Sequence, residues 1–578
     1  MNNNVVFNPK NYALGKLISD IENGDIALPD LQRPFVWEPI KVRDFIDSLY
    51  KGLPTGTIIL WEIIEPGNIK RINPDGTREP RYLVIDGQQR LTSLYSIIYN
   101  KKVLNKNFNN VKLKISFNPI LEKFEVWNAA IEKDAEWIPN ISSIFENSSS
   151  FTFVKNYLDN LSIHKSIDSK IIDKVSKNIE RLYSIKDYPF TVLELSSDLD
   201  PEEVSEIFVR INSKGKSLNQ SDFILTLMAV YWDEGRKQLE KFCEESRKIS
   251  NKVQSSFNII KMEPNPEHLV RSIVGYAFNR GRLKYAYLIL KGRDFENRSF
   301  SEELRKKNFE IFKNGQQKVI DLVNWHDYVK IIYSAGFVNS KMISSKTAFF
   351  VTYSFYLIGK DKGVEYKLLE KLIKKWFAFS ILTQRYTGSP ESQIEQDLID
   401  LKREDFEEFI EKRIRLEFSE NFWDTNLPEG LLVTSNTTSF AFLIYLAAQV
   451  YEDKKVLFSD IKLRDVLNPL LKPKKNLIDK HHIFPVNYLK NIGIKEIRDI
   501  NQIANIIYLE YKDNIKISDL PPNDYWEILT KDLSYKEKLE ILKEYDLPNE
   551  FLNMDYYTFL VERRKLIAKR IKKYFESL

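Results

Sequence analysis

The chain has 578 residues, of which 43% are hydrophobic and 29% charged, and its formal net charge is +5. A chain of this length is too long for one hydrophobic core, and its composition is that of a soluble globular protein with several domains. The small positive charge permits nucleic-acid binding but does not argue for it. The single cysteine, Cys243, excludes an internal disulfide and a thiolate zinc cluster.

The sequence shows neither a signal peptide nor a membrane span. The N-terminus lacks a basic stretch followed by an apolar one. The longest apolar stretches, 348–358 and 440–450, are shorter than the roughly 20 residues that a bilayer requires, and they have the pattern of buried helices. We therefore expect a cytoplasmic protein without a membrane partner.

The first 230 residues mix strand and helix patterns. The hydrophobic spacing predicts helices at 39–50, from about residue 88 and from about residue 200. It predicts strands at 57–62, 82–85 and 190–195, and a hairpin formed by 112–117 and 124–127.

From about residue 225 to 425 almost every segment has the pattern of an amphipathic helix, and turn residues become frequent at 426–439. We therefore predict an α+β fold with three domains, at 1–230, 231–425 and 426–578, the middle one helical. The chain ends in a basic amphipathic helix at 560–575. Its charged side chains are interpreted either as the solvated face of a packed helix or as a phosphate-contacting surface.

A candidate anion site follows the strand at 82–85. Asp86-Gly87 forms a turn and a helix begins at about Gln88, so first-turn amides and the positive end of the helix dipole lie there. Arg90 adds a cation, Gln88 and Gln89 add donors, and Asp86 could coordinate a metal or orient a water molecule. An Asp-Gly pair is also a common hairpin turn, and that interpretation stays open.

Two further segments carry groups that a triphosphate pocket needs. One is the proline-bounded loop at 28–37, and the other is the glycine-containing loop at 208–218. Separately, each loop could be a turn that stabilises the fold. Together with Arg90 they supply cations and donors suited to phosphate. The side chains concerned are Gln32, Arg33, Trp37, Arg210, Asn212 and Lys214.

These three separated motifs resemble, in order, the N-terminal nucleotidase domain of the GmrSD-like modification-dependent (type IV) restriction proteins, over roughly residues 10–230. The motifs are Gln32-Arg33-Pro34-Phe35-Val36-Trp37, Ile85-Asp86-Gly87-Gln88-Gln89-Arg90-Leu91-Thr92 and Phe208-Val209-Arg210-Ile211-Asn212 with Gly215. The resemblance implies a fold related to the ParB/sulfiredoxin superfamily, and binding and hydrolysis of a nucleoside triphosphate by this DGQQR domain. The segment 385–392 also looks like part of this family's middle region, with no role that we assign.

A second candidate site lies near the C-terminus. Two of the five histidines, His481 and His482, are adjacent and directly precede Ile483-Phe484-Pro485, and Asn505 and Asn514 follow. This order resembles a ββα-metal (HNH-type) nuclease site and the C-terminal nuclease half of GmrSD-like proteins, over about residues 430–540. The alternative is two structural histidines in a turn before a proline.

The resemblance assigns roles to these residues. Phosphodiester hydrolysis needs an activated water and a cation that stabilises the developing charge. His482 is expected as the general base, and Asn505 as the residue that supports the loop. His481 and Asn514 are expected to bind one divalent metal, Mg²⁺ or Mn²⁺, with Asp479 as a further candidate ligand. Many such sites carry an acidic residue where this chain has His481, and histidine suits Mn²⁺ or Ni²⁺ better than Mg²⁺.

The two sites together predict an NTP-regulated, metal-dependent DNA endonuclease of anti-phage defence. The expected substrate is modified double-stranded phage DNA, for example with glucosylated hydroxymethylcytosine. A homodimer is expected because one nuclease site per chain would cut one strand. Two alternatives stay open: an NTPase-nickase stimulated by phosphorothioate or by a partner, and a nucleotide-switched DNA-binding regulator with an inactive nuclease fold.

Overall fold

The computed structural model divides into two compact units, Met1–Arg236 and Lys237–Leu578. It describes residues 6–29, 35, 37–62, 69–70, 80–104, 110–146, 149–199, 203–204, 207, 221, 224–225, 228, 232–247, 258–294, 301–388, 390–471, 478–517 and 519–578. The described structure is mixed α/β and mostly helical, with a small mixed sheet near the N-terminus. The three-domain division and the relation to the ParB/sulfiredoxin superfamily stay predictions.

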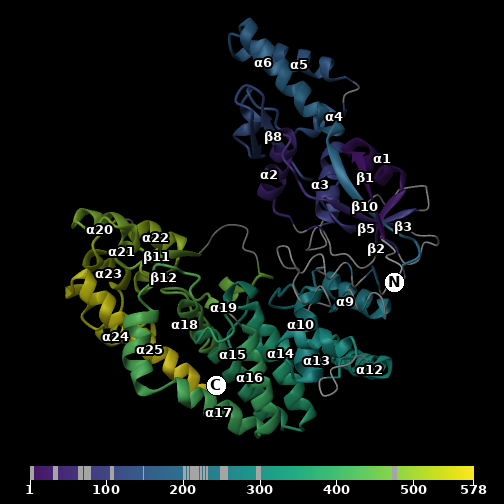
Figure 1. Ribbon diagram of the computed structural model, residues 1–578. Coiled ribbons are helices and arrows are strands. Elements are labelled where there is room, and N and C mark those ends of the chain that lie inside the picture. The colour runs from purple at the N-terminus through teal and green to yellow at the C-terminus, as the bar shows by residue number, and fades with distance from the viewer. Residues whose placement is uncertain are drawn as a thin grey trace. The chain divides into compact units, whose positions relative to one another are not determined.

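A six-stranded sheet organises the first unit (Figure 1). Its strand order is β1 (Phe7–Ala13), β10 (Pro189–Leu195), β3 (Ile58–Glu62), β5 (Tyr82–Asp86), β2 (Ile26–Pro29) and β4 (Ile69–Lys70). The pairs β10–β3 and β2–β5 are parallel, and the other neighbours are antiparallel. The predicted strands at 57–62, 82–85 and 190–195 are thereby confirmed to within one residue at every end.

The apolar character of β3 and β5 follows from their place in the middle of the sheet. Alternate side chains of a strand point to opposite faces. Ile58 and Leu60 therefore join a large hydrophobic cluster on one face, whereas Ile59 and Ile85 join a second cluster with Leu195. Because both faces of the sheet are covered, the sequences of these strands are continuously apolar and do not alternate between apolar and polar residues.

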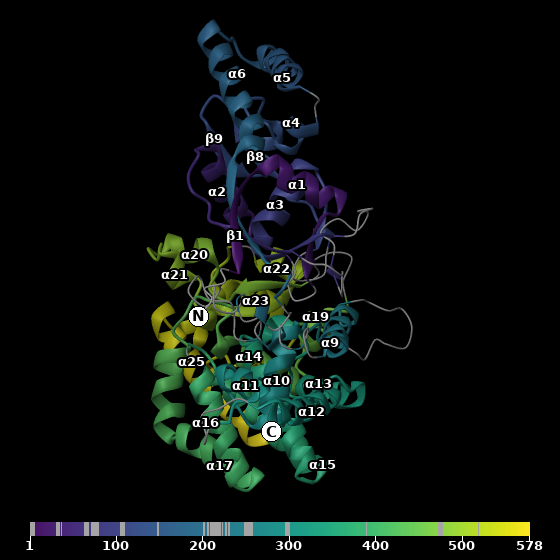
Figure 2. The same ribbon diagram turned by 45° about the vertical axis from the view of Figure 1, so that its right-hand side comes forward.

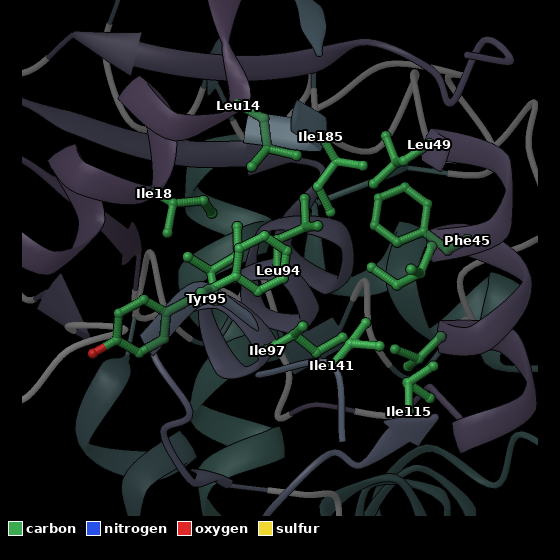
Figure 3. Packing of buried hydrophobic residues seen from close by; sticks show 14 of the residues in the cluster. Leu14, Ile18, Phe45, Leu49, Leu94, Tyr95, Ile97, Ile115, Ile141 and Ile185 are labelled. Carbon is green, nitrogen blue, oxygen red and sulfur yellow. The ribbon is translucent and has the colours of Figure 1, made fainter. Parts of the chain in front are cut away.

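Three helices pack on the large cluster: α1 (Leu14–Asn23), α2 (Pro39–Tyr50) and α3 (Gln88–Ile98). Figure 3 shows Ile18, Phe45 and Leu94 from these helices gathered in one core. The predicted hairpin is present as β8 (Ile115–Asn118) and β9 (Lys123–Val126), with Ile115 opposite Val126. The remaining elements are β6 (Val103–Leu104), β7 (Asn110–Val111), α4 (Ser142–Glu146), α5 (Ser150–His164) and α6 (Ser169–Tyr183). The start of the helix expected near residue 200 lies outside the described residues.

A group of packed helices, the first of which begins just before the boundary at Arg236, forms the start of the second unit (Figure 2). They are α9 (Asp233–Glu245), α10 (Pro266–Phe278), α11 (Leu283–Leu290), α12 (Glu302–Val319), α13 (Leu322–Ser334), α14 (Lys346–Asp361), α15 (Tyr366–Leu382), α16 (Pro390–Arg403) and α17 (Phe406–Glu417). Residues 348–359 of α14 are buried all round, which accounts for the apolar stretch at 348–358. Within the described part of the chain, no helix is both long and apolar enough to cross a membrane.

The segment 385–392 has a structural role at its first two residues. Asp397 of α16 is fully buried and accepts two hydrogen bonds from the Arg385 guanidinium, at 2.8 and 2.6 Å, and one from the Tyr386 hydroxyl at 2.8 Å. A buried carboxylate needs such partners because it has lost its water. These contacts lock the loop between α15 and α16.

The C-terminal part of the second unit surrounds a small two-stranded sheet. Its elements are η5 (Phe422–Leu431), α18 (Phe440–Tyr451), α19 (Leu463–Leu467), β11 (Ile478–His482), α20 (Val486–Asn491), α21 (Ile497–Ile500), β12 (Ile506–Glu510), α22 (Tyr511–Ile517), α23 (Pro522–Thr530), α24 (Tyr535–Glu544) and α25 (Tyr556–Ser577). The apolar stretch at 440–450 is the buried helix α18, as expected.

The basic helix expected at 560–575 lies within α25, and several of its cations are used inside the unit. Arg563 is 1% exposed, and Arg570 is paired with Asp546 and Glu452. Lys572 reaches Glu420 at 2.7 Å. These contacts favour the packed-helix interpretation of α25 over a phosphate-contacting surface.

Candidate functional site

The histidine pair lies on one strand of a strand–strand–helix arrangement. β11 pairs antiparallel with β12, so that His481 lies opposite Ile507 and His482 opposite Ile506. α22 follows β12 directly and carries Asn514. The buried apolar residues of β12 attach this hairpin to the core of the unit. The histidines and Asn514, which are far apart in the sequence, therefore belong to neighbouring elements of the fold.

His481 and Asn514 face each other. Nδ1 of His481 lies 2.7 Å from Oδ1 of Asn514, although the two residues are 33 positions apart in the sequence. His481 is 7% exposed, and its burial lowers its pKa to about 4, against the raising effect of the Asn514 hydrogen bond. The imidazole is therefore neutral at physiological pH, as a metal ligand must be.

The amide oxygen of Asn514 only accepts a hydrogen bond, so Nδ1 of His481 carries the proton in this contact. The lone pair available to a divalent cation is therefore on Nε2, which is buried and has no hydrogen-bond partner among the described residues. Binding of a cation through Nδ1 would require that proton to leave. Imidazole nitrogen and amide oxygen are both ligand types for Mn²⁺ and related ions, and such ions commonly keep water at their other positions. Within the described residues, no three His, Cys, Asp or Glu side chains come together as a metal cluster. Asp479 lies in β11 opposite Leu509, but its side chain is outside the part of the chain that the structure describes.

His482 has a separate partner. Its Nε2 lies 2.9 Å from Oδ1 of Asn501, the residue after α21. His482 is partly buried, and this burial lowers its pKa below the usual value, while the hydrogen bond to Asn501 raises it. Its neutral form, the form that accepts a proton, is therefore populated at neutral pH.

Asn505 clamps the backbone between the two strands. It is fully buried; its Oδ1 accepts from the Phe484 amide at 2.8 Å, and its Nδ2 donates to the carbonyls of Phe484 and Ile500 at 3.1 Å each. A buried amide with three such bonds fixes the chain locally, because breaking any of them would leave a polar group without water. Asn505 thus holds the local backbone, and its role in a nuclease site stays a prediction.

Two helices reinforce the same loop. Arg563 of α25 donates to the carbonyls of Ala504 and Ile506, at 2.8 and 3.0 Å, on either side of Asn505. Tyr525 of α23 donates to the carbonyl of Ile483 at 2.6 Å, next to the histidine pair. Sequence reasoning missed Arg563, Tyr525 and Asn501 as parts of this site. The only feature of the sequence that relates Asn501 to the motif is its position four residues before Asn505.

The N-terminal candidate site is a strand–turn–helix, as expected. Asp86 ends β5, Gly87 has φ +97°, and α3 begins at Gln88. An L side chain is strained at this positive φ, and a Cβ would also have to displace the terminal carbon of Ile58 at 2.3 Å, so the turn favours glycine. Gln88 and Gln89 occupy the first turn of α3, and Gln89 is buried.

Arg90 forms hydrogen bonds to other groups of the protein. Its guanidinium donates to the carbonyls of Thr55 and Thr57, at 2.8 Å each, and to Asp86 at 3.0 Å. The Arg90 side chain is 13% exposed, and burial lowers its pKa. It therefore ties the segment 55–57 to the Asp86 turn. The ligand contact that the sequence suggested for Arg90 stays a prediction.

The companion loops are only partly described. Trp37 packs edge-on against Phe45 of α2, with ring centroids 5.3 Å apart, and the ammonium of Lys41 lies 4.5 Å from its ring. The other expected residues of these loops lie outside the described residues: Gln32, Arg33, Arg210, Asn212 and Lys214. Their assembly around Asp86 stays a prediction.

Comparison with known proteins supports the N-terminal resemblance. The model of the GmrSD restriction endonuclease N-terminal domain matches residues 14–229. An uncharacterized protein of Methanocaldococcus jannaschii is 25% identical over 600 residues, covering 94% of this chain and 92% of the relative. The family match covers the Asp86 turn but not the histidine pair, so the nuclease resemblance of the C-terminal part stays a prediction. The alignment with the archaeal relative includes both units.

Proposed function

We propose that the chain is a metal-dependent DNA endonuclease of the GmrSD type whose cleavage site is formed by His481, His482 and Asn514. The observation that carries the proposal is the pairing of β11 with β12 and α22, which brings His481 to 2.7 Å from Asn514 with His482 next to it. The match of residues 14–229 to the N-terminal domain of GmrSD restriction endonucleases supports the same class of activity.

The chemistry divides between the histidines. The ring of His482 takes a proton from a water molecule, whose oxygen forms a bond to phosphorus while the bond to the 3′ oxygen breaks. His481 and Asn514 hold the divalent cation, which when bound stabilises charge on the phosphate and on the leaving oxygen. Asn505 and Arg563 keep the loop between the strands in place, so the base does not have to be ordered during the reaction.

The N-terminal unit is proposed as the nucleotide-binding regulator. Asp86, Gly87, Gln88 and Gln89 form the turn and first helical turn at which a phosphate would bind, and Arg90 fixes the adjacent segment 55–57. The companion residues Gln32, Arg33, Trp37, Arg210, Asn212 and Lys214 are proposed to complete the pocket. The nucleoside triphosphate would regulate cleavage by His482.

The proposed substrate is modified double-stranded phage DNA, bound by a homodimer in which each chain cuts one strand. The test is cleavage of matched DNAs that are unmodified, glucosylated on hydroxymethylcytosine, or phosphorothioated, with Mg²⁺ or Mn²⁺ and with or without each nucleoside triphosphate. Cutting of the glucosylated DNA alone supports the proposal. Nicking of phosphorothioated DNA alone supports the stimulated nickase. Nucleotide-dependent DNA binding without any cutting supports the regulator and overturns the proposal.

A further inference from the structure

Asn501 is the contact of His482 that the sequence motif does not contain. Its Oδ1 lies 2.9 Å from Nε2 of the imidazole. A carbonyl oxygen can only accept a hydrogen bond, so Nε2 carries the proton and donates it. In a neutral imidazole with a protonated Nε2, the lone pair that can accept a proton is on Nδ1.

The backbone on both sides of Asn501 is fixed. The carbonyl of Ile500 accepts hydrogen bonds from the Asn505 amide and from the Tyr556 hydroxyl, at 3.1 Å each. The Tyr556 hydroxyl also donates to the carbonyl of Asp499 at 2.7 Å. After Asn501, the amide of Ile503 donates to the carbonyl of Thr434 at 2.9 Å. The backbone that carries the Asn501 side chain is therefore held in place by hydrogen bonds on both sides.

The two asparagines of this loop thus have different contacts. Asn505 is fully buried and bonds to backbone groups. Asn501 bonds through its side chain to the proposed base. A group that orients a base and selects its tautomer acts on the chemical step, because the wrong tautomer presents a donor where an acceptor is required.

We propose that Asn501 is a positioning residue that holds His482 as the Nε2–H tautomer and leaves Nδ1 to accept the proton of the attacking water. This inference rests on the proposed nuclease function, with His482 as its base. Asn501 is not part of the His–Asn–Asn motif, and its contact determines which of the two ring nitrogens of His482 carries the proton.

The kinetic test compares Asn501→Ala and Asn501→Asp in the full chain, with Asn491→Ala as a matched control on the exposed end of α20. Asparagine to alanine at position 501 should lower kcat about 10- to 100-fold with KM for DNA unchanged. The aspartate variant keeps an acceptor for Nε2–H and should restore most of kcat at pH 8. Equal impairment of both variants, or an unchanged kcat in Asn501→Ala, would overturn the inference.

The tautomer can be measured without any cleavage. The chain has five histidines, so ¹⁵N-histidine labelling gives few ring signals, and the His482 signals are those lost in His482→Ala. In the metal-free full chain, His482 should show a protonated Nε2 and an unprotonated Nδ1, and Asn501→Ala should show a mixture. A protonated Nδ1 in the unsubstituted chain contradicts the inference.

The two kinds of failure are distinguishable. Cleavage that persists in His482→Ala overturns the nuclease assignment itself. Cleavage that needs His482 but is unaffected by Asn501→Ala overturns only the role of Asn501. A melting temperature of Asn501→Ala matching that of Asn491→Ala would show that the kinetic loss is not a loss of folding.

Discussion

The two candidate sites differ in what their polar side chains bind. At the C-terminal site, His481 and His482 each face the amide side chain of an asparagine from a later segment. At the N-terminal site, Arg90 binds two backbone carbonyls and Asp86. The first arrangement is proposed as a reactive site, whereas the contacts of Arg90 in the second stabilise a turn. A short polar motif beside a buried strand can therefore mark either the chemistry of a site or its scaffold.

Apart from loss of the proposed base His482, the largest expected effect is at the proposed metal ligands. Asn514→Ala and His481→Ala each remove one of two ligands, so cleavage at a fixed low Mn²⁺ concentration should fall about 100-fold or more. Raising the Mn²⁺ concentration should recover part of the activity, because the ion can still bind to the remaining ligand. Titration of cleavage rate against Mn²⁺ measures this. Loss of activity with an unchanged metal requirement would argue against these ligands.

The next effect tests the frame of the C-terminal site. Arg563→Met keeps the bulk of a buried side chain but leaves the carbonyls of Ala504 and Ile506 without their donor. We expect a loss of about 3 kcal/mol in stability and a lower melting temperature of the second unit. Lys565→Met, on the exposed side of the same helix, is the control. If Arg563→Met and Lys565→Met had the same melting temperature, Arg563 would not support this loop.

A pH dependence of stability follows from the buried His481. Its folded pKa is about 4, below the value of about 6.5 in an unfolded chain, so the unfolded state binds a proton first as the pH falls. The neutral ring contributes stability that is fully present above about pH 6.5 and is lost progressively down to about pH 4.

The contribution lost between pH 6.5 and 4.5 is on the order of 2 kcal/mol. His268, whose pKa burial lowers to about 3, should add a similar slope in the same unit. His481→Gln should therefore flatten the curve without abolishing it. Urea unfolding from pH 7 to pH 4.5 checks this, and equal slopes in the two proteins would contradict it.

The smallest effect tests the N-terminal frame. Arg90→Lys keeps a positive charge but cannot bind Thr55, Thr57 and Asp86 at once. We expect a loss of about 1–2 kcal/mol in the stability of the first unit, together with weaker nucleotide binding. Arg81→Lys, an exposed arginine paired with Glu62, is the matched control. Nucleotide affinity that falls in Arg90→Lys without any loss of stability would mean that Arg90 contacts the nucleotide directly.

Sequence reasoning reached the residues whose type is itself the signal. Two adjacent histidines stand out in a chain that has only five, and Asn505 and Asn514 follow in the order of the motif, so the sequence alone names the expected set. The buried strands β3 and β5 could be predicted for a similar reason, since a short continuous apolar run bounded by turn residues is typical of a strand covered on both faces. The resemblance of the N-terminal motifs is supported by the family match over residues 14–229.

The rest depends on tertiary contacts that no local pattern records. Arg563 and Lys565 lie two residues apart in one basic helix, yet the first is buried against backbone carbonyls and the second is half-exposed beside Glu562. Arg90 has the same sequence pattern whether it binds a phosphate or the carbonyl of Thr55. Asn501 is an ordinary loop residue until the fold brings it to His482.

His482 is proposed as the base of a metal-dependent cleavage site. The decisive measurement is single-turnover cleavage of glucosylated phage DNA with Mn²⁺, comparing the unsubstituted chain with His482→Ala, while nucleotide hydrolysis is followed in parallel. We predict that cleavage falls about 1,000-fold in His482→Ala and that nucleotide hydrolysis is retained. Cleavage at the unsubstituted rate in His482→Ala would show that His482 is not the base.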